Sequence, residues 1–183
     1  WTNFNFIIYR IKFIKKKIRT VPDFPKPGIM FRDITPLLSD AEGFQRVLKV
    51  LEERYRNKEI DLVAGIESRG FIVASALASR LRKGIILIRK PGKLPREIVK
   101  EEYDLEYGKD TIEMHKDSVQ PGQKVLLVDD LLATGGTALA ACNLIERLGG
   151  KIVECAFIVE LPDLEGREKI KHPSFTIVEF EGE

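Results

Sequence analysis

Residues 125–150, VLLVDDLLATGGTALAACNLIERLGG, carry the pattern that decides the fold. Residues 125–128 form an unbroken apolar run, which is typical of a parallel strand buried on both faces. From Thr137 the apolar residues recur at helical spacing, and Gly149-Gly150 can adopt the left-handed conformation that ends a helix. The stretch therefore predicts strand, loop and helix, with the loop beyond the carboxyl end of a strand, where open parallel sheets bind ligands.

The loop itself has the composition of an anion site. Gly135 and Gly136 allow backbone N–H groups to approach a ligand closely, and Thr134 and Thr137 add hydroxyl donors. The start of the helix adds a partial positive charge. These features predict a cradle for a monophosphate, although no ATP-type loop and no dinucleotide fingerprint is present.

Two adjacent carboxylates, Asp129 and Asp130, precede this loop. They would repel a bare phosphate, but they can accept hydrogen bonds from the hydroxyl groups of a sugar phosphate. A divalent metal nearby would reduce the repulsion further. The alternative is an ordinary strand-to-helix turn with an Asp cap and flexible glycines.

A second strand is predicted at residues 62–66, followed by Glu67, Ser68, Arg69 and Gly70. The guanidinium of Arg69 is a rigid fork of donors that suits phosphate oxygens. A solvated surface arginine is the alternative. The position at the carboxyl end of a strand favours a phosphate or diphosphate site.

A third predicted strand, residues 85–88, is followed by a basic turn in which Arg89, Lys90 and Lys93 surround Pro91-Gly92. A solvated basic turn is again the alternative. Together the three strand ends match a ligand that carries a phosphate at one end and a diphosphate at the other.

The elements expected along the chain alternate between strands and helices. Helices are predicted at residues 44–55, 71–81 and from 137, and strands at 62–66, 85–88, 125–128 and 153–159. This alternation predicts an α/β fold with a parallel sheet. Residues 94–118 exceed an ordinary connection, and we interpret them as a mobile flap with a turn at 107–108 that excludes water from the site.

Composition limits the remaining possibilities. The 183 residues are 44% apolar and 32% charged, with a net charge of +2, which does not indicate a general nucleic-acid binder. Cys142 and Cys155 are interpreted as buried thiols of a reducing compartment. Only two histidines are present, so a histidine metal site or a Ser-His-Asp triad is not expected.

Residues 1–20 are rich in Lys and Arg and contain no Asp or Glu. Their longest apolar run is too short for a membrane span or a secretory signal. We interpret them as a basic leader before a single domain at 21–183. An organelle transit peptide, a translated upstream segment and a helix packed on the domain all remain open.

Five segments, taken in order, resemble the type I phosphoribosyltransferase family and in particular its adenine-specific members. They are VPDFPKPGIMFRDITPLL (21–38), AGIESRGF (64–71), IRKPGKLP (88–95), YDLEYGKDTIEMHKDS (103–118) and VELPDLEGREKI (159–170). The resemblance covers roughly residues 16–183. It implies a Rossmann-like parallel-sheet core with flanking helices, a small hood and the mobile flap.

The resemblance also implies a role for each matching residue. Glu106 and Arg69 are expected to be catalytic. The ribose and 5′-phosphate of phosphoribosyl pyrophosphate (PRPP) are expected at Asp129, Asp130, Ala133, Thr134, Gly135, Gly136 and Thr137. The diphosphate is expected at Glu67, Ser68, Arg69, Arg89, Lys90 and Lys93. Adenine is expected at Met30, Phe31, Arg32 and Leu161, and Met30 departs from the small aliphatic residue often found at its position.

The implied reaction converts adenine and PRPP into AMP and diphosphate. Mg²⁺ is expected to arrive on the substrate's oxygens, with no direct protein ligand. A cytoplasmic homodimer is expected, in which the neighbouring subunit contributes to the diphosphate site, with no nucleic-acid or membrane partner. Two alternatives remain: a phosphoribosyltransferase for another base, such as a 6-oxopurine or orotate, and a non-catalytic regulator of the same fold that senses PRPP or a purine. A regulator would normally carry a DNA-binding segment, and residues 1–20 are short and show no helix-turn-helix pattern.

Overall fold

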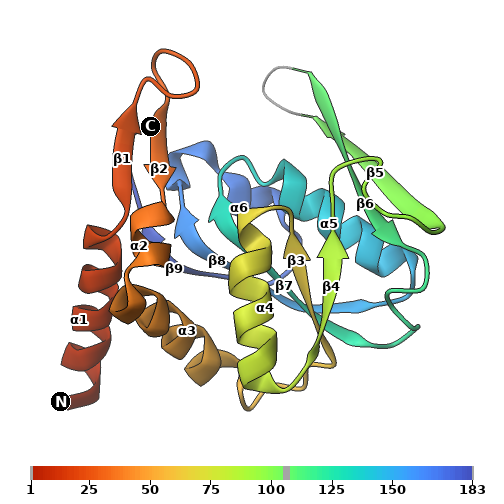
Figure 1. Cartoon of the computed structure of the whole chain (residues 1–183), viewed down its shortest axis with the longest axis horizontal. Helices are drawn as coiled ribbons and strands as arrows, with labels where there is room; N and C mark the ends of the chain where they lie inside the picture. The colour runs from red at the N-terminus through yellow and green to blue at the C-terminus, as the bar shows by residue number, and fades with distance from the viewer. Residues whose placement is uncertain (1, 105–107, 183) are drawn as a thin grey trace.

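The computed structural model describes residues 2–104 and 108–182 (Figure 1). The helices are α1 (Thr2–Lys16), α2 (Thr35–Ser39), α3 (Ala41–Tyr55), α4 (Arg69–Leu81), α5 (Gly136–Arg147) and α6 (Gly166–Lys169), with a 3₁₀ turn at Pro162–Leu164. The strands are β1 (Arg19–Pro22), β2 (Met30–Asp33), β3 (Leu62–Ile66), β4 (Gly84–Ile88), β5 (Ile98–Asp104), β6 (Lys109–His115), β7 (Lys124–Leu132), β8 (Lys151–Glu160) and β9 (Ser174–Glu179).

A five-stranded parallel sheet in the order β4-β3-β7-β8-β9 forms the centre of the molecule. The predicted α/β fold with a parallel sheet is therefore confirmed. Two antiparallel hairpins, β1–β2 and β5–β6, lie outside this sheet. In Figure 1 they stand on opposite sides of the carboxyl ends of β3 and β4.

The central strand β7 shows how the sheet separates two apolar layers. Its side chains alternate between faces, as in any strand. Leu126 and Val128 pack in the layer that contains residues of α3 and α4. Val125 and Leu127 pack in the layer that contains residues of α5 and the β5–β6 hairpin. All four side chains are at most 1% exposed, so β7 is held rigidly from both sides.

The predicted end of β7 was wrong. The strand was expected to stop at Val128, but it continues to Leu132 because its last residues still pair with β8, for example Asp129 with Phe157. The two acidic residues Asp129 and Asp130 therefore lie within the ladder rather than in the loop after it. Their backbone is fixed by the sheet.

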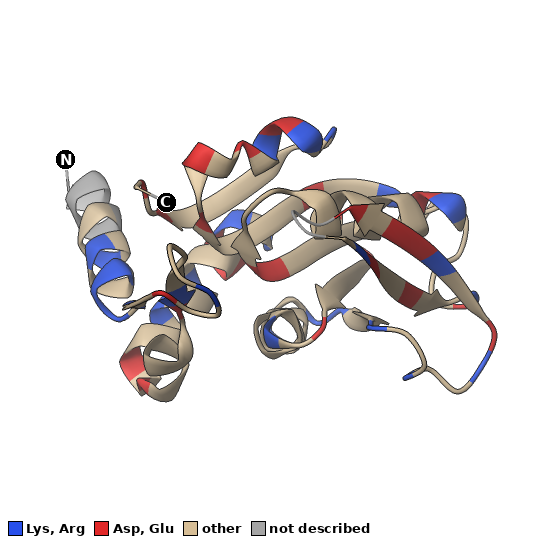
Figure 2. Ribbon diagram, turned by 90° about the horizontal axis from the view of Figure 1, so that it is seen from above, with Lys and Arg blue, Asp and Glu red and all other residues tan. Residues whose placement is uncertain are grey.

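Residues 2–16 form α1, which packs on α3 and β9. Ile14 is fully buried in the apolar layer beneath it, and Arg10 and Lys17 form ion pairs with Glu53 and Asp40. Figure 2 shows the Lys and Arg bands along the coloured part of this helix. In this structure residues 2–16 are thus a helix that packs on the rest of the domain.

None of the helices within the described ranges combines the length and apolar character of a membrane span. Cys142 on α5 and Cys155 on β8 are both buried, with their sulfur atoms 3.5 Å apart. Their burial agrees with the interpretation drawn from the sequence.

Candidate functional site

A cavity of about 330 Å³ lies at the carboxyl ends of β3 and β7. It brings together most of the residues that the sequence placed at separate strand ends. Its lining includes Glu67, Ser68, Arg69, Lys90, Asp129, Asp130 and the whole loop from Ala133 to Thr137. Polar groups from three strand ends therefore converge on one space, as the sheet order requires.

Six predicted site residues within the described ranges do not line this cavity. They are Arg89, Lys93, Met30, Phe31, Arg32 and Leu161. Glu106, the predicted catalytic acid, falls outside the described residues.

The acidic pair is held by charge and by the backbone. Asp130 is 6% exposed and accepts a hydrogen bond from Nε of Arg69 at 2.5 Å. The Asp129 carboxylate accepts one from the Asp130 N–H at 2.9 Å. Burial raises the pKa of Asp129, and the adjacent charge of Asp130 raises it further. A ligand that donates hydroxyl hydrogens, or that brings positive charge, would relieve this repulsion.

The glycine loop is shaped by two close approaches. Gly135 adopts the left-handed conformation with φ of 79° and caps α5. A Cβ on Gly135 would lie 2.3 Å from the carbonyl oxygen of Gly166, so α6 packs directly against the loop. A Cβ on Gly136 would instead lie 3.2 Å from the Asp104 carbonyl oxygen. Gly166 was not predicted as part of the site, and its distance in sequence leaves no local signal that could have revealed it.

Arg69 begins α4, at the end of the loop that follows β3. Burial alone would lower its pKa, but the charge of Asp130 and the hydrogen bond to it outweigh burial, so the pKa of Arg69 is raised. Its guanidinium also lies 5.7 Å from the centre of the Phe31 ring on β2. Arg69 therefore connects the cavity to the β1–β2 hairpin.

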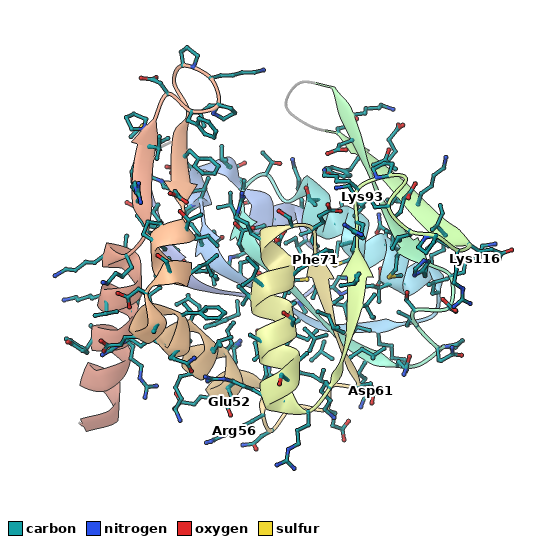
Figure 3. All side chains as sticks on the ribbon, viewed as in Figure 1. Glu52, Arg56, Asp61, Phe71, Lys93 and Lys116 are labelled. Atoms are coloured by element: carbon teal, nitrogen blue, oxygen red, sulfur yellow. The ribbon has the colours of Figure 1, made fainter. Side chains whose placement is uncertain are left out.

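The basic turn after β4 is organised by Glu67. Its carboxylate accepts hydrogen bonds from the Lys90 backbone N–H at 3.0 Å and from Nε of Arg89 at 3.2 Å, and it also contacts Lys93. Burial favours the neutral acid, but these hydrogen bonds, first that from Lys93, lower the pKa of Glu67. Figure 3 labels Lys93 in this turn and Phe71 on the first turn of α4.

Lys90 is the basic residue of this turn that lines the cavity. Its ammonium donates to the Tyr103 hydroxyl at 3.1 Å and contacts the Asp110 carboxylate. Tyr103, on β5, also lines the cavity, although the sequence interpretation did not single it out. Its position opposite Asp110 across the hairpin could have been inferred only with the register of β5 and β6.

The predicted base-binding residues lie on and beside the β1–β2 hairpin. Phe31 faces Arg69, whereas Arg32 points away, because neighbouring residues of a strand project to opposite faces. The Arg32 guanidinium donates to the Thr20 hydroxyl at 2.6 Å and lies 4.7 Å from the centre of the Phe180 ring. The side chain of Arg32 would have to adopt a different rotamer to contact a ligand beside Phe31. The backbone of Arg32, in contrast, keeps its place on β2 whatever rotamer the side chain adopts.

Leu161 follows β8 and is 5% exposed. Its N–H donates to the carbonyl oxygen of Leu132 at 3.0 Å, next to the cavity lining. The Phe180 ring, which Arg32 contacts, is also contacted by Lys15 of α1, whose ammonium lies 4.7 Å from the ring centre. The ring therefore joins α1, β2 and the segment after β9.

Comparison with known proteins agrees with this geometry. The family model described as "Phosphoribosyl transferase domain" matches residues 35–181. The adenine phosphoribosyltransferase of Chlorobaculum tepidum is 56% identical over 175 residues, which cover 93% of this chain and 99% of the relative.

Two crystal structures show the same fold. That of the Rhodothermus marinus adenine phosphoribosyltransferase has a TM-score of 0.90 at 48% identity, covering 94% of this chain and 99% of that chain. That of the Saccharomyces cerevisiae enzyme, complexed with adenine and an imino-altritol bisphosphate, has a TM-score of 0.89 at 38% identity, covering 93% and 99%. A match of this extent and identity establishes that the chain belongs to the phosphoribosyltransferase family, among the adenine phosphoribosyltransferases.

Proposed function

We propose that this protein catalyses the conversion of adenine and PRPP into AMP and diphosphate, an adenine-salvage reaction. The observation that carries the proposal is the cavity at the carboxyl ends of β3 and β7. It combines an acidic pair, a glycine loop at a helix start and basic side chains at the neighbouring strand end. PRPP carries a complementary group for each of the three.

The 5′-phosphate is assigned to the loop at the start of α5. The N-terminal N–H groups of a helix have no partners within the helix and carry partial positive charge. Thr134 and Thr137 add hydroxyl donors, and both line the cavity. The ribose hydroxyls would then donate to Asp129 and Asp130, which lie just before the loop on a rigid strand.

The diphosphate is assigned to Ser68, Arg69 and Lys90. Arg69 and Ser68 stand at the start of α4, so this group also meets a helix N-terminus. As the bond between C1 of the ribose and the diphosphate breaks, negative charge grows on the leaving oxygens. Cations already in place stabilise that charge, and removing such a donor typically costs about 10²–10³ in rate. Arg69 is therefore proposed as a catalytic residue.

The developing positive charge on the ribose ring makes exclusion of water necessary, because water would compete with adenine for C1. Tyr103 of the β5–β6 hairpin supplies an apolar wall to the cavity. Glu106 is proposed, by resemblance, as the acidic residue near the reacting base and sugar. It keeps this role as a proposal, since it lies outside the described residues.

Adenine is assigned to the space between Phe31 and Leu161. Among the residues that the structure describes, β2 pairs with β1 along one edge and with no strand along the other, so peptide groups of Met30 and Arg32 are proposed to meet a ligand there. Adenine presents an acceptor at N1 beside a donor at its 6-amino group, and a 6-oxopurine presents the reverse. A backbone site that matches one pattern leaves its polar groups unpaired against the other, and such mismatches discriminate strongly.

Mg²⁺ is included in the proposal as a cation that accompanies PRPP. Within residues 2–104 and 108–182 no group of three or more His, Cys, Asp or Glu side chains could hold a metal ion. The ion would therefore take most of its oxygens from the substrate and water, with Asp129 and Asp130 close by. When bound, it would neutralise charge on the diphosphate.

A homodimer is proposed through the outer face of β4 and α4. Ile85 and Leu87 on this edge strand are 38% and 42% exposed, and Ile72 on α4 is 44% exposed. Arg89 continues the same strand, so it is the side chain proposed to reach a partner's diphosphate site. Sedimentation of a Leu87→Asp variant tests this face, and we expect a monomer.

A cytoplasmic location is part of the same proposal, supported by the low cysteine content.

One assay tests the proposed reaction. Purified protein is incubated with PRPP, Mg²⁺ and each of adenine, hypoxanthine, guanine and orotate, and the nucleotide products are separated. We expect AMP from adenine and little product from the other bases. Better turnover of hypoxanthine would refute the adenine assignment and leave the PRPP site intact. Binding of PRPP with no turnover of any base would instead support a regulator.

A further inference from the structure

Lys90 lines the cavity, yet its charge is committed to the β5–β6 hairpin. Its ammonium donates to the Tyr103 hydroxyl at 3.1 Å and contacts Oδ2 of Asp110. The same Oδ2 accepts a hydrogen bond from the Tyr103 hydroxyl at 3.1 Å. The other oxygen, Oδ1, accepts one from the Thr111 backbone N–H at 2.8 Å. The carboxylate is thus fixed in orientation and aimed at Lys90.

The other basic side chains in and beside the proposed diphosphate site are also paired with carboxylates. Arg69 pairs with Asp130, and Arg89 shares Glu67 with Lys93. Asp130 lies on β7, and Glu67 is the first residue after β3, so both carboxylates are carried by the central sheet. Asp110, the partner of Lys90, belongs instead to the hairpin.

The hairpin also contacts the glycine loop. Tyr103 faces Asp110 in the register of β5 and β6, and the next residue, Asp104, places its carbonyl oxygen 3.2 Å from where a Cβ of Gly136 would lie. Two adjacent residues of β5, Tyr103 and Asp104, therefore meet the lysine assigned to the diphosphate and the loop assigned to the 5′-phosphate. A change in the partner of Lys90 acts directly on the hairpin.

We propose that Asp110 and the diphosphate compete for Lys90, so that diphosphate binding transfers this lysine from the hairpin to the ligand and diphosphate release returns it. This inference rests on the proposed function, because it assumes that the cavity binds diphosphate. A diphosphate carries more negative charge than a carboxylate and can displace it from the ammonium. After release, Asp110 covers the ammonium again, so the departing ligand leaves no half-buried cation without a partner.

The competition with Asp110 lowers the affinity of the site for diphosphate by a limited factor. The side chains of Lys90 and Asp110 are 38% and 28% exposed, so their pair is half-buried and contributes modestly. Burial opposes the charged ammonium, but the hydrogen bonds to Asp110 and Tyr103 outweigh it and raise the pKa of Lys90. The lysine therefore stays charged while Asp110 is its partner, and this charge is what a diphosphate would compete for.

The test measures binding of Mg²⁺–diphosphate and of AMP to the full chain by calorimetry, with dissociation rates by stopped flow. For Asp110→Asn we expect diphosphate to bind about fivefold more tightly and to leave more slowly, which is the size of a half-buried ion pair. AMP, which has no diphosphate, should bind as in the wild type. Hydrogen exchange of residues 98–104 and 108–115 should rise on addition of diphosphate to the wild type, and should already be high in Asp110→Asn.

Glu102→Gln is the matched control, because it removes the same charge from the same hairpin. Glu102 forms an ion pair with Lys109, its side chain is 58% exposed, and it does not pair with Lys90. Its diphosphate affinity should stay within about twofold of the wild type, since exposed charges are screened by salt. In a Lys90→Met background, Asp110→Asn should have no further effect. If Asp110→Asn does not fold, Tyr103→Phe should tighten diphosphate binding in the same direction, by a smaller factor.

Three results would overturn the inference. One is weaker or unchanged diphosphate binding by Asp110→Asn when the wild type binds normally. Another is equal tightening by Glu102→Gln, which would show a general effect of charge. The third is a wild type that binds neither PRPP nor diphosphate, which would remove the proposed function and this inference together.

Discussion

The two adjacent glycines of the phosphate loop should respond very differently to the same added methyl group. Gly135 has φ of 79°, and a Cβ there would lie 2.3 Å from the carbonyl oxygen of Gly166 and 3.0 Å from its Cα. The left-handed conformation costs a non-glycine residue about 1–2 kcal/mol. Relief of the overlap adds about 1–3 kcal/mol, because α6 must move. Gly135→Ala should therefore lower the free energy of unfolding by about 2–5 kcal/mol.

Gly136→Ala is the matched control, one residue away. Its Cβ would meet the Asp104 carbonyl oxygen at 3.2 Å and a Tyr103 ring carbon at 3.4 Å, which asks the hairpin to shift by only a few tenths of an ångström. Alanine also favours the first turn of a helix over glycine by up to about 1 kcal/mol. The free energy of unfolding should thus stay within about 1 kcal/mol of the wild type.

Guanidinium unfolding of the two variants measures both effects, and AMP titration measures the loop. Gly135→Ala should lose AMP binding, because the loop must distort to relieve the contact with Gly166. Equal stabilities for the two variants, or a stable Gly135→Ala that binds AMP normally, would falsify the assignment of the close contact. Such a result would also weaken the case that α6 supports the loop.

Three further predictions concern the ligand ends, the core and the leader. Arg69→Ala should weaken diphosphate binding at least tenfold more than AMP binding, measured by calorimetry, since a charged hydrogen bond contributes about 1.5–3 kcal/mol; equal losses would contradict it. Burial alone would raise the pKa of Glu154, but hydrogen bonds, first from Arg54, lower it from 4.5 to about 2. A lowered pKa stabilises the fold above pH 4.5, and this stability, at most about 3 kcal/mol, is lost as pH falls from 4.5 towards 2. Unfolding of Glu154→Gln should therefore depend less on pH in that window; an unchanged slope would contradict it. Deletion of residues 1–14 should reduce the free energy of unfolding, because Ile14 is fully buried. The kcat and KM of the folded variant should stay close to those of the wild type. A large fall in kcat would place the leader in the site.

The central sheet could be predicted because its elements carry strong periodic patterns. The strands at 62–66 and 85–88 and the helices α3 and α4 were expected within a few residues of their observed bounds. The end of β7 was missed, because Asp129 and Asp130 look like loop residues, and only pairing with β8 extends the strand past them. The short strands β1 and β2 form only in contact with each other, so neither has a signal of its own.

The candidate site was predicted to the extent that it consists of strand ends. Parallel strands bring their carboxyl ends to one edge, so Arg69, Lys90 and Asp130 were expected to meet, and the cavity contains all three. The partners of these side chains could not be predicted from the sequence in the same way. The contact of Lys90 with Asp110 depends on the register of a hairpin, and the direction of Arg32 depends on which face of β2 it occupies.

The Phe180 ring bears on the order in which the protein is assembled during its synthesis. Lys15 and Arg32 both lie over this ring, so the base-side hairpin takes support from a residue that the ribosome adds almost at the end of this sequence. The sheet from β4 to β8, with its phosphate loop, is complete before that residue emerges. A released chain truncated just before Phe180 should therefore lose purine binding more than phosphate binding, because the two halves of the ligand depend on parts of the sequence that are synthesised at different times.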